Sequence, residues 1–364
     1  MVHNEDFLRA WRLHSQKMAS QRCQSPEDAV GWLGGVQAQN YDGAKWSTGL
    51  RGESFNEAVV DKAIHDLNVV RTWAFRGTLH FLVASDLTWL SALLAPGIIK
   101  GNARRYRELE LKEVDFQKSQ EVLRQVLQGK RSLTRSKIKA LFKDQGVPAE
   151  GQQVPYLLQR AALDGLLCHG PQLGGETTYV LATEWVKPGK SLDRPEALRN
   201  LAFRYFSSHG PATERDFAWW AGLTLEQARS AMNSTSELVL VELEEICYWA
   251  VGEPPPRETV ESGFLLPPFD EYLLGYKDRS AILDRDRTKR VNPGGGMLKP
   301  TVVLNGEILG TWRSKVRKTG MEVSIQPFGD LDSNQRDLID LAASRLADFK
   351  SLPVEVIYET IKTP

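Results

Sequence analysis

The chain has 364 residues, which is too long for one simple hydrophobic core and predicts two to four modules. Lys plus Arg and Asp plus Glu both number 46, so no overall positive charge indicates a general nucleic-acid binder, and only a local basic surface could play that role. Neither an apolar leader nor an apolar run of membrane-spanning length is visible, and the three cysteines lack a metal-binding spacing. These features predict a cytoplasmic protein with no membrane partner, no metal and no cofactor.

The first part of the chain, from about Asp6 to Leu82, is predicted to fold as three helices followed by strands. Ser25 and Ser54 are expected to cap the second and third of these helices. The apolar spacing then changes to that of strands in residues 69–73 and 78–83, with a turn between them. Three helices followed by a hairpin predict a winged helix.

The same order of elements recurs twice. Helical spacing in residues 116–167 precedes a predicted hairpin with a tip at Gly174-Gly175. Helical spacing in residues 198–232 precedes two further predicted strands, at 238–241 and 246–251. Residues 90–111 predict a basic linking helix between the first two units. This repetition predicts three tandem winged helices, and the alternative is three unrelated helical pieces.

The last part of the chain is predicted to be rich in strands. A proline run in residues 253–257 indicates a linker. Asn305-Gly306 lies between two apolar strands and predicts a type I′ hairpin, and an amphipathic helix is expected at 334–349. We therefore predict an α+β fold, in which three tandem winged-helix modules pack around a C-terminal strand-rich, β-barrel-like module. The predicted boundaries are 1–92, 93–187, 188–253 and 258–364.

Two glutamines in the first module are the candidate catalytic residues. Gln37 and Gln39 follow a double glycine and are separated by one small residue. In an extended segment, residues two apart point to the same side, so both amides could face one point in space and orient a water molecule. The alternative is that both are solvated loop residues. Asn40 and His80 are further candidates for contact with the substrate, and His80 is otherwise a hydrogen-bonded structural histidine.

Four stretches together resemble the AlkZ family of bacterial DNA glycosylases. They are G-V-Q-A-Q at 35–39, R-T-W-A-F-R-G-T-L-H-F at 71–81, P-F-D-E-Y-L-L-G-Y-K-D-R at 268–279 and P-T-V-V-L-N-G-E-I-L-G-T-W at 300–312. They span most of the chain in family order. The related YcaQ (AlkX) branch carries an acidic residue where Gln39 stands, which places this sequence on the AlkZ side.

The resemblance implies a monofunctional DNA glycosylase of base excision repair. Such an enzyme uses water rather than a lysine nucleophile, and an N7-alkylated purine departs without protonation because its ring is already cationic. Gln37 and Gln39 would then position the water. Bulky adducts and interstrand cross-links are implied as substrates. Asp270, Glu271, Asp278 and Arg279 are expected to form a structural network, with a catalytic carboxylate among them as the alternative.

The expected partner is double-stranded DNA that contains alkylated bases, bound by a monomer in the bacterial nucleoid. Basic residues in three stretches are the predicted phosphate contacts. They are Arg104, Arg105, Arg287, Lys289, Arg313, Lys315, Arg317 and Lys318. Residues 313–320 resemble the hairpin with which the family probes DNA beside the lesion. The alternative for each stretch is solvated surface charge.

Two other functions remain open from the sequence. A winged-helix transcriptional regulator would bind DNA without catalysis, but its recognition helices should display Arg, Asn and Lys, and the predicted third helix at 153–167 is largely apolar. The second alternative is an interaction scaffold with no affinity for DNA.

Overall fold

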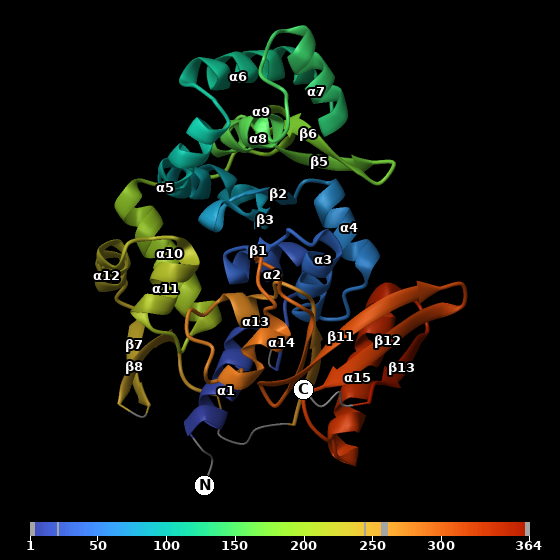
Figure 1. Ribbon diagram of the computed structural model, residues 1–364. Helices are drawn as coiled ribbons and strands as arrows, with labels where there is room; N and C mark the ends of the chain where they lie inside the picture. Colours follow the sequence, from blue (N-terminus) through green and yellow to red (C-terminus); the bar gives the residue numbers. More distant parts are fainter. Residues whose placement is uncertain (1–3, 20–21, 244, 256–260, 361–364) are drawn as a thin grey trace.

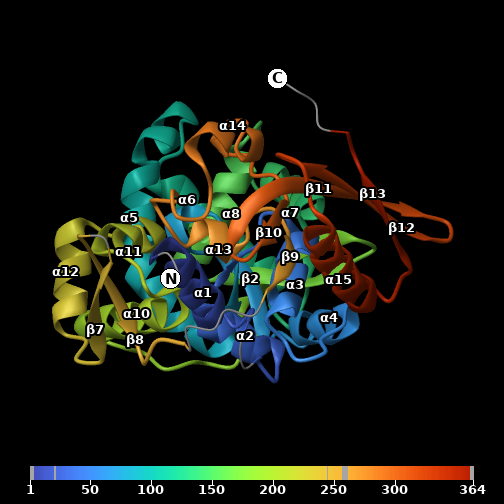
Figure 2. The ribbon, with the colours of Figure 1, turned by 90° about the horizontal axis from the view of Figure 1, so that it is seen from below.

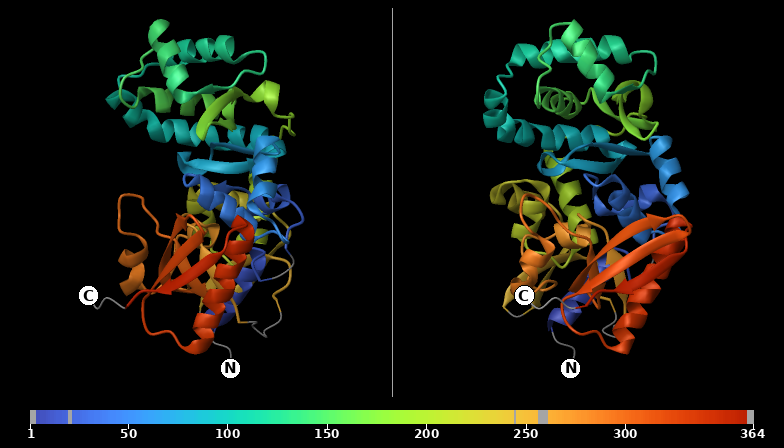
Figure 3. Two further views of the ribbon diagram at one scale, coloured as in Figure 1. Left: turned by 90° about the vertical axis from the view of Figure 1, so that its right-hand side faces the viewer. Right: turned by 45° about the vertical axis from the view of Figure 1, so that its right-hand side comes forward.

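The computed structural model describes residues 4–19, 22–243, 245–255 and 261–360, and its fold is α+β, as predicted. Figures 1 and 3 show the helices of residues 113–163 at one end, those of residues 26–65 in the middle, and the C-terminal sheet together with the first helix at the other end. The N-terminal helices are α1 Asn4–Ser15, α2 Pro26–Leu33, α3 Tyr41–Leu50 and α4 Glu57–His65. They are followed by strands β2 Val69–Trp73 and β3 Leu79–Val83, with the short 3₁₀ helix η1 Phe75–Gly77 between them.

Local capping explains most of these boundaries. The Ser25 side chain accepts the Asp28 N–H at the start of α2, as predicted. The prediction that Ser54 caps the next helix was wrong, because α4 is capped by Asn56 and Ser54 has a φ of 59°. Helix α3 was not predicted as a separate element; it begins at Tyr41, directly after the glutamine motif.

A six-stranded sheet joins the first two helical units. Its strand order is β1-β3-β2-β5-β6-β4, where β1 is Val36–Gln37 and β4 is Leu133–Thr134. The two halves meet at β2 and β5, through the pair Arg71 and His169. The strands of the first two predicted modules therefore form one continuous sheet, while the module boundaries themselves stay a prediction.

The second unit begins with the long helix α5, which follows the 3₁₀ helix η2 Ala84–Asp86. Its elements are α5 Leu87–Glu108, α6 Glu113–Leu127, α7 Arg135–Asp144, α8 Gln153–Leu163, β5 Leu167–Leu173, β6 Glu176–Leu181 and α9 Ala182–Trp185. The third unit has the same order of helices and hairpin. Its elements are α10 Arg194–His209, α11 Glu214–Ala221, α12 Leu225–Asn233, β7 Leu238–Leu243 and β8 Ile246–Val251.

The C-terminal part is an open sheet of five strands in the order β13-β12-β11-β10-β9. Its strands are β9 Gly263–Leu266, β10 Thr301–Leu304, β11 Glu307–Arg317, β12 Gly320–Pro327 and β13 Val354–Tyr358, accompanied by α13 Glu271–Leu274, η3 Arg285–Arg287, α14 Thr288–Val291 and α15 Ser333–Lys350. Asn305 and Gly306 have φ values of 50° and 82°, as a type I′ turn requires. Residues 256–260 of the predicted linker region lie outside the described residues.

The β11–β12 hairpin extends away from the rest of the molecule (Figures 1 and 2). Side chains 313–319 near its tip are exposed, whereas those closer to its base are mostly buried. The pattern follows from packing, because only the base of the hairpin lies against the body.

The C-terminal part shares one hydrophobic core with the N-terminal helices. Trp46 of α3 packs against Phe349 of α15 with ring centroids 5.0 Å apart, and its indole N–H donates to the Leu265 carbonyl at 2.7 Å. Beside this contact, the Arg51 guanidinium donates to both oxygens of Asp270 at 2.9 Å. Both side chains are almost fully buried, at 0% and 1% exposure.

Two general features complete the description. Among the described helices, none combines the length and apolar character needed to cross a membrane. Cys23 and Cys168 are buried and Cys247 is exposed, and all three are free thiols.

Asp270→Asn should lower the free energy of unfolding by about 3–5 kcal/mol, because it leaves the Arg51 guanidinium buried without its counter-charge. Urea unfolding near neutral pH measures this loss. Asp66→Asn is the matched control, since it breaks the exposed Lys62–Asp66 pair, which solvent screens, and should change stability little. Equal losses in the two variants would contradict the structural role of the buried pair.

Candidate active site

The two glutamine side chains of the motif contact each other. The amide nitrogen Nε2 of Gln37 donates to Oε1 of Gln39 at 2.9 Å. Gln37 is 6% exposed, whereas Gln39 lies at the surface. This bond does not use the side-chain oxygen Oε1 of Gln37 or the side-chain NH₂ group of Gln39. The pair therefore offers one acceptor and one donor group to an incoming water molecule.

The double glycine before the motif allows the chain to turn sharply from α2 into β1. Gly34 ends α2 in the left-handed region with a φ of 76°, and Gly35 has a φ of 151°. A Cβ atom on Gly35 would lie 3.0 Å from the side chains of Leu82 and Phe75. Glycine is therefore needed at this position for both its conformation and its small size.

Charged side chains hold the motif backbone on both sides. The Gln37 N–H donates to Oε1 of Glu271 at 3.2 Å. The carbonyl of Ala38, between the two glutamines, accepts from Nε and Nη2 of Arg71 at 3.0 and 2.8 Å. The Ala38 N–H donates to the Leu79 carbonyl at 2.7 Å. These bonds fix the extended conformation that brings the two amides together.

Glu271 is a buried carboxylate at the centre of the structure, with 1% exposure. Its Oε2 accepts from the indole N–H of Trp220 at 3.0 Å and lies 3.5 Å from Nε2 of His209. Burial favours its neutral form, but the contact with His209 and the bond from Trp220 outweigh burial and hold the pKa of its carboxyl below the ordinary value. The carboxylate is occupied by these donors, so its geometry suits positioning of Gln37 rather than proton transfer.

The rest of the predicted acidic network is also engaged in structure. Asp270 binds Arg51, and the Asp278 N–H donates to Asp216 at 3.2 Å. Nε of Arg279 donates to the Leu273 carbonyl at 2.8 Å.

His80 is the direct strand partner of Gln37 and is 2% exposed. Its Nδ1 lies 3.0 Å from the Thr78 carbonyl, which assigns the proton of the neutral ring to Nδ1. Burial lowers the pKa of His80 to about 4, so the ring is neutral at physiological pH. Asn40 is exposed and caps α3, with its Oδ1 accepting the Gly43 N–H at 2.7 Å.

The predicted DNA-binding residues lie in separate places. Arg104 and Arg105 are at the exposed end of α5, where both bond to Glu108. Arg287 and Lys289 lie in η3 and α14, and the remaining four are on the β11–β12 hairpin. Figure 1 shows α5 well apart from the hairpin, so one compact basic patch does not contain all of them.

Arg71 and Trp220 both hold the site together, although no pattern in the sequence predicted a role for either. Arg71 stands in a strand between Val70 and Thr72, and an arginine flanked in this way by residues that become buried is the one local sign of its role. Trp220 gives no comparable sign, because its contact with Glu271 joins residues 51 positions apart.

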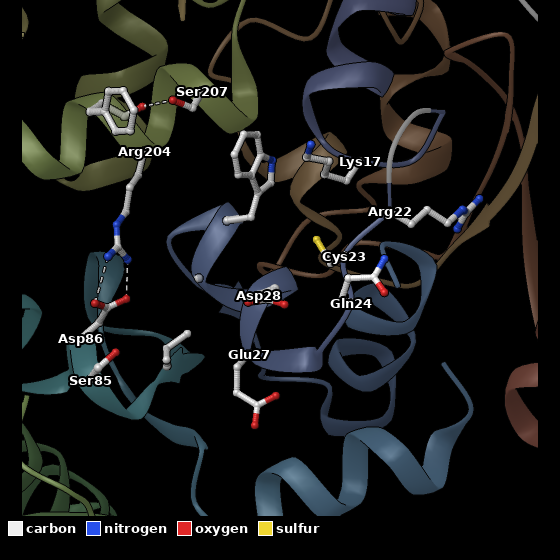
Figure 4. Close-up of a pocket in the computed structure, with 14 residues that line it drawn as sticks. Lys17, Arg22, Cys23, Gln24, Glu27, Asp28, Ser85, Asp86, Arg204 and Ser207 are labelled. Atoms are coloured by element: carbon white, nitrogen blue, oxygen red, sulfur yellow. Dashed lines mark hydrogen bonds and ion pairs between the residues drawn. The ribbon is translucent and has the colours of Figure 1, made fainter. Parts of the chain in front are cut away.

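A cavity of about 620 Å³ lies away from the glutamine pair, between α2 and α10 (Figure 4). Among its charged side chains, Arg204 donates to both oxygens of Asp86, and the Lys17 ammonium lies 4.4 Å from the centre of the Trp32 ring. Within the described part of the chain, no group of three His, Cys, Asp or Glu side chains is placed to hold a metal ion.

The family model described as "DNA glycosylase AlkZ-like" matches residues 30–349. An interstrand DNA cross-link repair glycosylase of Streptomyces sahachiroi is 28% identical over 382 aligned positions, covering 96% of this chain and 98% of that protein. The solved structure of the DNA glycosylase AlkZ from the same organism superposes with a TM-score of 0.82 at 26% identity, covering 98% of this chain and 100% of that one.

The buried neutral state of His80 predicts a pH dependence of stability. Its folded pKa of about 4 lies below the ordinary 6.5, so between these values the unfolded chain binds a proton that the folded chain does not, and stability falls as the pH falls. His80→Gln should therefore reduce this slope by up to about 1.4 kcal/mol per pH unit. Urea unfolding across this interval measures the slope.

The matched control is His65→Gln, because the His65 side chain is exposed at 75%, so this variant measures the effect of losing a surface histidine. The buried His169 and His209 also have lowered pKa values and retain their part of the slope in both variants. An unchanged slope in His80→Gln would contradict the neutral buried ring.

Proposed function

The chain belongs to the AlkZ-like DNA glycosylase family, and from this premise we propose that it hydrolyses the N-glycosidic bond of cationic N7-alkylated purines in DNA. The family is one of DNA repair enzymes, so the substrate is DNA and the bond that breaks joins a base to its sugar. The proposal concerns which bases are removed and which side chains act. The pairing of the Gln37 and Gln39 amides is the single observation that supports it most strongly.

The chemistry suits a site without a strong acid. An N7-alkylated purine carries a positive charge, and breaking the C1′–N9 bond returns the electron pair to the base and neutralises it. Water then adds to C1′ of the oxocarbenium sugar, and its proton passes to solvent. Gln37 and Gln39 accept from and donate to that water without ionising, so their contribution is positioning.

The side chains around Gln37 and Gln39 are also unsuited to protonating the leaving nucleobase. His80 is neutral with its proton directed at the Thr78 carbonyl, and Glu271 is ionised and bonded to Gln37 and Trp220. Selectivity for bases that leave without protonation follows from this environment. Normal purines do not meet that condition.

Bulky adducts and interstrand cross-links are part of the proposal. The related Streptomyces protein is named as a cross-link repair glycosylase. In this chain Gln39 is at the surface beside the buried Gln37, so the reacting bond can approach the pair without a large base entering an enclosed cavity.

We further propose that the β11–β12 hairpin contacts the DNA backbone. Arg313 and Arg317 form exposed ion pairs with Glu359 and Glu322 at 2.7 and 2.6 Å, and such pairs exchange readily for phosphate contacts. Lys315 and Lys318 of the same tip are exposed and bear no ion pair to a described carboxylate. A protruding, positively charged hairpin on a protein of neutral net charge suits binding by a monomer to the DNA of the nucleoid.

Gln37→Ala should slow release of the alkylated base by about 100-fold, because the water loses one of its two positioning groups. Single-turnover release of N7-alkylguanine from alkylated duplex DNA measures the rate. DNA affinity should stay unchanged, and Gln120→Ala on α6 is the matched control. Wild-type release by Gln37→Ala would remove this residue from the mechanism.

Replacing Lys315 and Arg317 together by Glu should weaken DNA binding. The slope of log affinity against log salt concentration should also fall, by the amount that about two phosphate contacts contribute. Fluorescence anisotropy at several salt concentrations measures both. Arg199→Glu with Arg229→Glu is the control, since it also reverses two exposed charges, on α10 and α12, which lie remote from the hairpin in Figure 1. Equal effects of the two changes would mean that net charge, and not the hairpin, determines affinity.

A further inference from the structure

Two arginines from distant parts of the chain lie over the same tryptophan ring. The guanidinium carbons of Arg76 in η1 and Arg279 after α13 are 4.6 and 5.4 Å from the centre of the Trp219 ring in α11. All three side chains are partly exposed. We call this group the Arg76–Trp219–Arg279 cluster.

The positive charges of the cluster are not neutralised by ion pairs. In the part of the chain that the structure describes, no carboxylate forms an ion pair with either guanidinium. Arg76 donates through Nη1 to the Trp220 carbonyl, and Arg279 donates through Nε to the Leu273 carbonyl. The remaining N–H groups of both fork-shaped side chains are available to a ligand.

Electrostatics shows that the two arginines influence each other. Burial lowers the pKa of both guanidiniums, and the charge of Arg76 lowers the pKa of Arg279 further. Glu271 is the nearest opposite charge acting on Arg76, but its oxygens accept from Gln37 and Trp220. The cluster therefore retains net positive charge in a partly desolvated position, where an anion is bound more strongly than at an open surface.

The cluster lies next to the glutamine pair. The Ala38 N–H donates to Leu79, so Gln39 follows alongside Thr78, at the turn that contains Arg76. The charges of Arg76 and Glu271 both act on His80, the strand partner of Gln37. Glu271 of α13 accepts from Gln37 of β1 and from Trp220 of α11, so these three elements meet at its side chain.

The turn at Arg76 is strained and borders a cavity. Arg76 has a φ of 56°, which a residue with a Cβ adopts only at a cost, and such strain persists most often at functional sites. The cavity beside it has a volume of about 350 Å³ and is lined in part by Gly97, Gly101, Asn102 and Gln227. Trp219 and Arg279 do not line this cavity, so it borders the cluster on the side of Arg76 alone.

We propose that Arg76 and Arg279, held over Trp219, bind a phosphodiester of the DNA strand that carries the damaged base, directly beside Gln39. The guanidinium forks match phosphate oxygens in geometry and charge, and Trp219 holds both in place. This site rests on the proposed glycosylase function and specifies where the strand is anchored. The arginines are positioning residues, because they fix the sugar relative to the amide pair without contacting the reacting bond.

The test compares Arg279→Gln with the wild type on a duplex that contains a tetrahydrofuran analogue of an abasic site. The glutamine can still donate to the Leu273 carbonyl. We expect Arg279→Gln to bind the duplex about tenfold more weakly, with a slope of log affinity against log salt that is smaller by the contribution of about one phosphate contact. Arg279→Lys should restore most of the affinity and most of the slope. Arg345→Gln is the matched control, since Arg345 is also partly buried and lies 5.2 Å from the centre of the Phe264 ring.

Single methylphosphonate linkages on either side of the analogue identify the phosphate. One neutral linkage should weaken binding by the wild type about tenfold and should have a clearly smaller effect on Arg279→Gln, in which only Arg76 is left to contact that phosphate. The proposal is contradicted if the losses of affinity from the neutral linkage and from Arg279→Gln are additive. It is also contradicted if Arg279→Gln binds the duplex as tightly as Arg345→Gln does. Binding to this non-cleavable duplex does not depend on base release, so a failed site is distinguishable from a failed glycosylase proposal, which Gln37→Ala tests separately.

Discussion

The hydrogen bond from the Gln37 N–H to the buried carboxylate of Glu271 joins parts of the chain that are 234 residues apart. The same carboxylate accepts from Trp220 of the third helical unit. One acidic side chain therefore connects the N-terminal motif, the third unit and the C-terminal part at a single point. A buried charge is tolerated only where it has such partners, so the contacts that satisfy Glu271 also determine where Gln37 lies.

The residue before Glu271 has a matching role. Asp270 caps the short helix α13 and binds Arg51 of the first unit. Two consecutive acidic residues thus attach α13 to the N-terminal helices and to the glutamine strand. On the other side of the motif, Arg71 donates to the Ala38 carbonyl. Its Nη1 lies 3.4 Å from Nδ1 of His169 in the second unit. The position of the amide pair is consequently sensitive to every major part of the fold.

Local signals were sufficient for much of the structure. Asn305-Gly306 specifies its turn through backbone preference alone, and the amphipathic spacing of residues 334–349 predicts helix α15. Helix α3 was missed because Gly43, Ser47 and Gly49 are poor helix formers, and tertiary burial overrides that propensity. Ser54 and Asn56 are both capping residues, and only the packed chain selects between them. The two glutamines were predicted to lie side by side because residues two apart in an extended segment point to the same side. The contacts of Glu271, Arg71 and Trp220 are non-local, so no periodic pattern in the sequence indicates them.

The amide pair also has a consequence for genome fidelity under the proposed chemistry. A carboxylic acid in this place could protonate an undamaged purine and release it by mistake, whereas an amide has no proton to transfer in this pH range. Discrimination then resides in the leaving tendency of the lesion itself, and recognition can be permissive toward the size and shape of the adduct. An enzyme of this kind acts on chemically diverse adducts but leaves undamaged purines in place, because it has no acid with which to protonate them.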